Sequence, residues 1–156
     1  GGLGHLFAKE LATHYQAQLI LTGRSPLNPH IQEKIAELKN LNSEVLYLQG
    51  DVSDLTTVKH WISIAQGRFG TLNGLIHSAG LLNDKLLIQK QEIEFDAVWA
   101  PKIQGTLNLD EATKSLSLDC FILFSSVASI FGNIGQADYA TANGFLDSFA
   151  HWRNQQ

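Results

Sequence analysis

Polar side chains that suit carbonyl chemistry follow one another between residues 126 and 143. Ser126 comes just after an apolar run, Tyr139 lies thirteen residues later at the start of a helical pattern, and Asn143 follows four residues after it. At helical spacing, Tyr139 and Asn143 share one face. A strand end, a loop and a helix start can therefore bring the serine and tyrosine hydroxyls towards one point.

This set of residue types fits the reduction of a ketone. The ketone oxygen becomes an alkoxide when the carbon accepts a hydride, and a phenol can protonate it. Because the unperturbed pKa of a phenol is about 10, a nearby ammonium helps by favouring the phenolate. Lys102 could supply the ammonium, and Ser126 would hold the carbonyl oxygen by a hydrogen bond. The structural alternative is a loop serine and a half-buried tyrosine anchor.

The elements that must position these residues alternate between strand and helix. Short apolar runs predict strands at residues 18–22, 44–49, 72–76 and 121–124. Helical periodicity predicts helices from the initial glycines onward and at residues 28–41, 55–65, 91–114 and 137–152. The alternation predicts a Rossmann-like α/β fold, a doubly wound parallel sheet with helices on both faces. In such folds the binding crevice lies at the carboxyl ends of the strands.

Several details of packing are also predicted. Leu3, Leu6, Phe7 and Leu11 should line one face of the first helix. Cys120, at a strand start, should be a small buried side chain rather than a nucleophile. Within the long helical region, Pro101 and Gly105 flank Lys102 and predict a local departure from regular helix.

Residues that suit a dinucleotide lie at the predicted strand ends. Gly1–Gly4 open a helix, where backbone N–H groups and the helix dipole favour a phosphate. Arg24 and Ser25 end the next strand, where an arginine accommodates a 2′-phosphate, although a solvated arginine in a turn is the alternative. Asp51 either faces the cofactor or caps a helix together with Ser53 or Asp54.

The predicted strand at residues 72–76 ends in small residues that let a cofactor lie close. His77 comes first, and we expect it to be packed and hydrogen-bonded rather than catalytic. The residues that follow are Ser78, Ala79 and Gly80. The convergence of these sites at one edge of the sheet is stronger support than any one of them.

Composition excludes several classes of function. Fifteen acidic and eleven basic residues argue against nucleic-acid binding. No run suits a membrane span, and the single cysteine fits a reducing, cytoplasmic setting. The chain contains no methionine and begins with two glycines, so we expect it to be an excerpt of a longer polypeptide.

The motifs together resemble the ketoreductase domain of modular polyketide synthases, within the short-chain dehydrogenase/reductase superfamily. The matching stretches cover almost the whole chain and are GGLG (1–4), GRS (23–25), GDVSD (50–54), IHSAG (76–80), APKIQGTLNLD (100–110), FILFSSVAS (121–129) and GNIGQADYATANGFLD (132–147). The resemblance implies a single NADP-binding domain over residues 1–156. It also implies NADPH-dependent reduction of a β-ketoacyl group, carried on the phosphopantetheine of an acyl carrier protein, with neighbouring synthase domains in the same polypeptide.

The resemblance assigns roles residue by residue. The implied catalytic residues are Ser126, Tyr139, Lys102 and Asn143, with lysine and asparagine exchanged relative to most short-chain dehydrogenases. The implied cofactor residues are Gly2, Leu3, Gly4, Arg24, Ser25, Asp51, Val52, Ser78, Ala79 and Gly80. The residues implied in substrate binding and stereocontrol are Leu82, Asn83, Asp84 and Gln136. No metal site is implied.

The chain also departs from the family pattern. The strand before the glycine loop is missing, and so are the lid and last strand after the tyrosine helix. We therefore expect these 156 residues alone to be inactive. Leu82-Asn83-Asp84 resembles the Leu-Asp-Asp signature of reductases that form the D-hydroxy product, with its middle acid replaced, while Ile134 and Asp138 replace the usual Pro and Asn. A non-reducing domain that only scaffolds a synthase module is the rival hypothesis.

Overall fold

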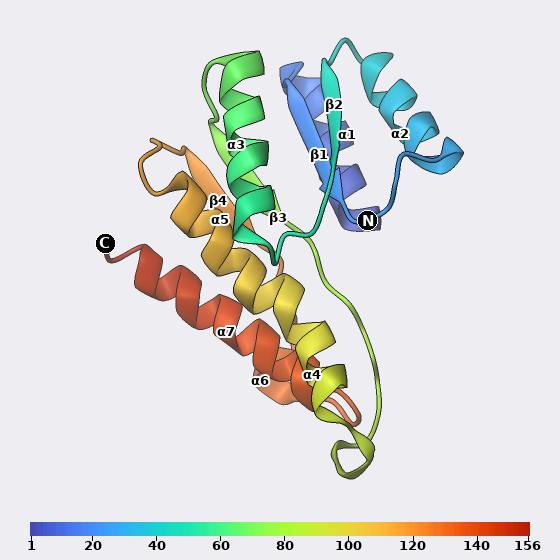
Figure 1. Cartoon of the computed structure of the whole chain (residues 1–156), viewed down its shortest axis with the longest axis vertical. Helices are drawn as coiled ribbons and strands as arrows, with labels where there is room; N and C mark the ends of the chain where they lie inside the picture. Colours follow the sequence, from blue (N-terminus) through green and yellow to red (C-terminus); the bar gives the residue numbers. More distant parts are fainter.

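The computed structural model describes all 156 residues, as an alternation of helices and short strands (Figure 1). The strands are β1 (Leu19–Gly23), β2 (Val45–Gln49), β3 (Gly74–His77) and β4 (Cys120–Leu123). The helices are α1 (Gly2–Tyr15), α2 (Pro29–Lys39), α3 (Leu55–Phe69), α4 (Glu92–Trp99), α5 (Gly105–Thr113), α6 (Ala128–Phe131) and α7 (Ala137–Arg153). Two short irregular helices complete the chain: a 3₁₀ turn at Leu87–Gln89 and a π-helix at Ala100–Gln104.

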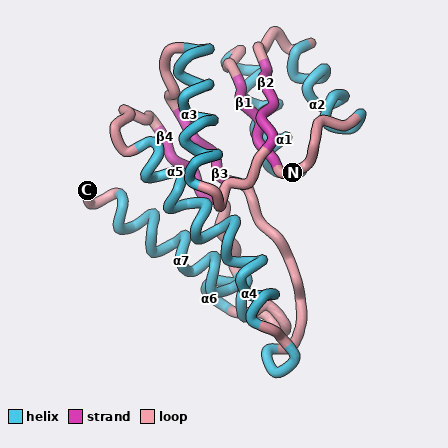
Figure 2. The backbone as a smooth tube through the Cα atoms, in the orientation of Figure 1, coloured by secondary structure: helices cyan, strands magenta, loops and turns pink.

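The four strands form two parallel pairs, and the pairs do not hydrogen-bond to each other (Figure 2). In the first pair Leu19 aligns with Val45, and in the second Gly74 aligns with Cys120. Parallel pairing between strands joined by helices confirms the doubly wound arrangement expected from the sequence. The pairs are separate, as expected if the strand before the glycine loop is missing.

The first pair carries a small core of its own. Ala8 and Ala12 of α1, Leu38 of α2, Leu19 of β1 and Val45 of β2 form a buried apolar cluster. The small side chains at positions 8 and 12 let α1 approach the strands closely. Of the apolar residues predicted to share one face of α1, Leu11 packs against this cluster, while Leu3 and Leu6 are more than half exposed.

The second pair is covered by α3, α5 and α7. Val58 and Trp61 of α3 pack with Leu109 of α5 against the strands and form a buried core. On α7, Phe149 packs in a T-shaped arrangement on Phe121 of β4, with ring centroids 6.3 Å apart. Aromatic pairs of this geometry add to simple area burial.

Two expectations about β4 are corrected by this arrangement. Its side chains alternate between exposed and half-buried, so it is not the fully buried strand that the apolar run indicated. Cys120 is exposed. The reason is that β4 has a hydrogen-bonded neighbour only in β3, so its other edge stays uncovered.

The region around Lys102 departs from regular helix as predicted. The run that the sequence indicates over residues 91–114 divides into α4, the π-helix and α5. Pro101 lies within the π-helix and Gly105 directly follows it. Proline cannot donate the regular backbone hydrogen bond, and π-bulges commonly relieve that defect. None of the helices is long and apolar enough to cross a membrane.

Candidate active site

The start of α7 carries Tyr139 and Asn143 one turn apart, as predicted. The Asn143 amide nitrogen donates to the Tyr139 carbonyl oxygen at 2.7 Å. Asn143 is fully buried, and its side-chain oxygen has no hydrogen-bond partner within the chain. A buried unpaired acceptor is costly, so this oxygen is available for a donor such as a water or an ammonium.

Lys102 lies beside the tyrosine. Its ammonium Nζ is 5.5 Å from the centroid of the Tyr139 ring and donates to the Phe124 carbonyl oxygen at 2.9 Å. The side chain is buried, and this burial lowers the pKa of the Lys102 ammonium. The loop at Gly80 closes over it, because a Cβ on Gly80 would lie 3.1 Å from the Lys102 Cε. The π-helix thus delivers the ammonium to the carboxyl edge of β3 and β4.

Ser126 lies in the loop after β4, but it forms no direct hydrogen bond with Tyr139. Its hydroxyl oxygen accepts from the Ala128 backbone N–H at 3.2 Å, which opens the short helix α6. The neighbouring Ser125 hydroxyl donates to the Asn143 carbonyl oxygen at 3.2 Å and so ties this loop to α7. The structure therefore brings Lys102, Tyr139 and Asn143 together and places Ser126 on the adjoining loop.

His77 is packed and hydrogen-bonded, as expected. Only 5% of its surface is exposed, and its Nε2–H donates to the Pro101 carbonyl oxygen at 2.9 Å. Burial lowers the pKa of His77 to about 4; the Lys102 charge acts in the same direction, and the hydrogen bond to Pro101 opposes them. The imidazole is neutral at pH 7 and links the end of β3 to the π-helix that carries Lys102.

The initial glycines lie against the end of β3. A Cβ added to Gly4 would lie 2.7 Å from the Ser78 hydroxyl oxygen, so only glycine permits this contact without a shift. Gly2 and Leu3 form the first turn of α1, whose N–H groups have no partner within the helix. Across the gap between the strand pairs, the Phe7 and Phe124 rings meet edge to face at 5.0 Å. The glycine turn, Ser78, Ala79 and Gly80 thus lie at one edge, as predicted.

Arg24 and Ser25 are exposed in the turn after β1, and the Arg24 guanidinium forms no ion pair. Two side chains of β2 hold the backbone of this turn. The Tyr47 hydroxyl donates to the Ser25 carbonyl oxygen at 2.6 Å, and the Gln49 amide donates to the Arg24 carbonyl oxygen at 3.2 Å. Sequence reasoning missed both, because their register opposite β1 becomes visible only once the strands are paired.

Asp51 and Val52 follow β2. The Asp51 carboxylate accepts from the Ser53 backbone N–H and hydroxyl, which lowers the pKa of Asp51. Asp54, not Asp51, caps α3 by accepting from its first N–H groups. Val52 lies against Gly105, where a Cβ would approach to 2.8 Å, and its carbonyl oxygen accepts from Asn108.

The segment with Leu82, Asn83 and Asp84 runs from β3 down to α4 and meets the start of α7. The Gln136 amide donates to the Asp84 carboxylate at 2.8 Å. The Lys85 backbone N–H donates to the Gly135 carbonyl oxygen at 2.9 Å. Leu82 is exposed. The predicted stereocontrol residues Asn83, Asp84 and Gln136 therefore belong to one contact zone beside Tyr139.

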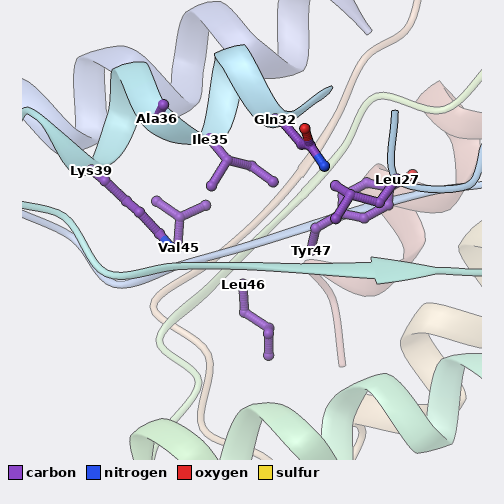
Figure 3. A pocket seen from close by; sticks show the side chains of 8 residues that line it. All are labelled: Leu27, Gln32, Ile35, Ala36, Lys39, Val45, Leu46 and Tyr47. Atoms are coloured by element: carbon purple, nitrogen blue, oxygen red, sulfur yellow. The ribbon is translucent and has the colours of Figure 1, made fainter. Parts of the chain in front are cut away.

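Two surface grooves lie elsewhere. One, of about 410 Å³, is formed between α2 and β2 and includes Leu27, Ile35, Val45 and Tyr47 (Figure 3). The other, of about 230 Å³, lies between the start of β4 and the end of α7. Neither contains a predicted site residue, so the chemistry is assigned from side-chain geometry rather than from a cavity.

Comparisons with known proteins agree with this geometry. The KR domain family model matches residues 1–156. Among curated proteins, polyketide synthase PksN of Bacillus subtilis strain 168 is 47% identical over 156 residues, which are 99% of this chain and 3% of the synthase. Polyketide synthase ThaG of Burkholderia thailandensis is 37% identical over 150 residues. The chain thus spans only a small part of the length of these relatives.

Two solved structures support the same family assignment. A ketoreductase domain from the bacillaene assembly line matches with a TM-score of 0.95 and 45% identity, over 98% of this chain and 37% of that one. An N-terminal ketoreductase from the macrolactin assembly line matches with a TM-score of 0.95 and 43% identity, over 97% of this chain and 31% of that one. The chain belongs to the KR domain family, the ketoreductase domains of polyketide synthases.

Proposed function

We propose that residues 1–156 form the nucleotide- and carbonyl-binding part of a single ketoreductase domain. Its reaction is the NADPH-dependent reduction of a β-ketoacyl thioester to the β-hydroxyacyl thioester. The observation that carries the proposal is the buried Lys102 ammonium, held by the Phe124 carbonyl 5.5 Å from the Tyr139 ring and covered by the Gly80 loop. A buried ammonium against a phenol is suited to proton transfer.

The chain's own residues would then act on the substrate oxygen. Tyr139 donates its proton to the oxygen as the β-carbon is reduced, and Lys102 stabilises the phenolate that remains. Ser126, on the loop after β4, turns its hydroxyl to the same oxygen and stabilises the developing charge. Asn143 offers its unpaired buried oxygen to an ammonium or a water that returns a proton to Tyr139.

The edge formed by Gly4 and Ser78 fits a dinucleotide. A side chain at position 4 would fill the space where the α1 N-terminus meets the end of β3, and the free N–H groups of that turn suit a pyrophosphate. When bound, the nicotinamide supplies the hydride. Arg24 and Ser25 hold the 2′-phosphate and thereby select NADPH, because Arg24 is exposed and has no carboxylate partner. Asp51, Val52, Ala79 and Gly80 complete the cofactor side.

The substrate is carried by a partner domain. We infer an acyl carrier protein whose phosphopantetheine presents the β-ketoacyl group, and neighbouring synthase domains in the same cytoplasmic polypeptide. Support comes from the relatives, which are multidomain synthases many times longer than this chain.

The proposal is tested with the full-length protein, a β-ketoacyl thioester and NADPH deuterated at the transferred position. We expect the hydroxyacyl product to carry one deuterium at the β-carbon. NADH should support the reaction much more weakly. If the thioester is recovered unreduced by a folded protein that binds NADPH, the domain is a scaffold and the proposal is wrong.

A further inference from the structure

One ion pair in the chain has both side chains buried, and it adjoins the candidate active site. Lys90 pairs with Asp138, and their side chains are 0% and 1% exposed. In every other ion pair each side chain keeps at least 19% of its exposure. Asp138 directly precedes Tyr139 in the first turn of α7. Neither Lys90 nor Asp138 is among the catalytic, cofactor or stereocontrol residues that the family resemblance implies.

The buried pair is built into a small network. The Lys90 ammonium also donates to the Asn83 carbonyl oxygen at 2.6 Å and lies 5.5 Å from the centroid of the Phe95 ring. The Asp138 carboxylate accepts from the Tyr139 backbone N–H at 2.8 Å. The backbone carbonyl oxygen of Asp138 accepts from the Trp99 indole N–H at 3.0 Å. The ammonium therefore joins the backbone of the 82–84 segment to the backbone of Tyr139.

Two further contacts join the same two segments. Gln136 donates to Asp84, and the Lys85 N–H donates to the Gly135 carbonyl oxygen. Gly135 has φ of 80°, and a Cβ there would lie 3.3 Å from the Lys85 nitrogen. Glycine is thus required by both the backbone conformation and the close approach. These contacts are polar and partly exposed, and Lys90–Asp138 is their buried anchor.

Stability alone does not account for such a pair. Removing two charges from water is expensive, and replacement of a buried ion pair by well-packed apolar residues is often neutral or stabilising. What an ion pair supplies and an apolar pair does not is a fixed direction and a fixed register between the segments it joins. Here the joined segments are the 82–84 wall and the helix turn that aims the Tyr139 phenol.

We propose that Lys90, through Asp138, is a positioning residue of the reductase. It holds the 82–84 segment and the first turn of α7 in one relation, so that the ketone meets the Tyr139 hydroxyl with only one face towards the hydride. The proposal rests on the function proposed above, because it concerns the substrate wall of the same site. Lys90 and Asp138 themselves do not touch the reacting atoms.

The decisive variant is the double substitution Lys90→Met with Asp138→Leu in the full-length protein. It replaces the pair by apolar side chains of similar size and leaves no uncompensated buried charge, so the fold is expected to be retained. The matched control is Arg153→Met with Asp110→Leu. That pair joins the other end of α7 to α5, with its nitrogen and oxygen 2.6 Å apart.

Four quantities are measured for each protein: the melting temperature, kcat and KM with a β-ketoacyl thioester, and the ratio of the two hydroxyacyl enantiomers. For the Lys90/Asp138 variant we expect kcat to fall by roughly 10²-fold, the scale of a misplacement of about 1 Å. The enantiomer ratio should fall by roughly tenfold or more, the scale of discrimination that a few contacts supply. The control should keep the wild-type ratio.

The outcomes separate this proposal from the proposed function. A wild-type protein that folds but reduces no thioester refutes the proposed function, and this inference with it. An active wild type and a stable double variant with an unchanged enantiomer ratio and kcat overturn the positioning role alone. If the double variant does not fold, the single variants Lys90→Arg and Asp138→Glu are measured instead, because each keeps the charge but displaces it. Unchanged ratios in both of these folded single variants also overturn the proposal.

Discussion

The buried His77 predicts a specific dependence of stability on pH. Its pKa is lowered to about 4 in the folded chain, mainly by burial, against 6.5 for an ordinary histidine. Between these values the unfolded chain binds a proton that the folded chain does not, so the free energy of unfolding decreases as pH falls. This lowering of the His77 pKa corresponds to about 3 kcal/mol of folding stability at neutral pH. The chain loses about 2 kcal/mol of that stability by pH 5.

The matched variant is His77→Gln in the complete domain. Its amide N–H can still donate to the Pro101 carbonyl oxygen, but it does not titrate between pH 4 and 7. Urea unfolding at pH 7.5, 6 and 5 gives the free energy for both proteins. We expect the wild type to lose about 2 kcal/mol more than the variant between pH 7.5 and 5. Equal losses of unfolding free energy in the two proteins would show that His77 protonates freely in the folded chain, which contradicts its burial.

Three further substitutions test individual contacts. Arg24→Ala should weaken NADPH binding far more than NADH binding, since only NADPH carries the 2′-phosphate; equal weakening in a titration would contradict the assignment. Tyr47→Phe removes the hydrogen bond to the Ser25 carbonyl and should raise the Kd for NADPH by roughly tenfold, the scale of one hydrogen bond of about 1.4 kcal/mol; an unchanged Kd would show that the turn holds without it. Lys102→Met removes the ammonium near Tyr139 and should lower kcat by roughly 10²-fold or more while the protein still binds NADPH. A near-normal kcat would exclude the ammonium from the reaction.

Local signals in the sequence were enough for the elements themselves. Apolar runs located all four strands to within two residues of an end, and Asp54 marked the start of α3. The departure from regular helix around Lys102 was also predictable, because Pro101 removes a backbone donor inside the helix. The short helix α6 was missed: at four residues it is too short to show a helical period, and this stretch was expected to be a loop.

Burial and long-range polar contacts were harder to predict from the sequence. The apolar run of β4 predicted a buried strand and a buried Cys120, but burial depends on which elements cover a strand rather than on the strand's own composition. Lys90 and Asp138 lie 48 residues apart and have no periodic relation, so their pairing appears only in three dimensions. Tyr47 and Gln49 act on the opposite strand for the same reason.

The candidate site shows both sides of this division. Tyr139 and Asn143 are neighbours through helical spacing, which a sequence displays directly. Lys102 was proposed as the ammonium from its chemistry, but it reaches them only because the π-helix and the ends of β3 and β4 meet. Ser126 was placed correctly on the loop after β4, while its direct contact with Tyr139 stays a prediction.

The central claim is that Tyr139 protonates the substrate oxygen at this site, and a single substitution addresses it. Tyr139→Phe keeps the packing of the ring and its place over the Lys102 ammonium but removes the proton donor. In the complete domain, with a β-ketoacyl thioester and saturating NADPH, we expect the rate of NADPH oxidation to fall by roughly 10²-fold or more, the scale of a lost general acid, at unchanged NADPH affinity. A variant that oxidises NADPH at a near-normal rate would remove Tyr139 from the mechanism and contradict the account.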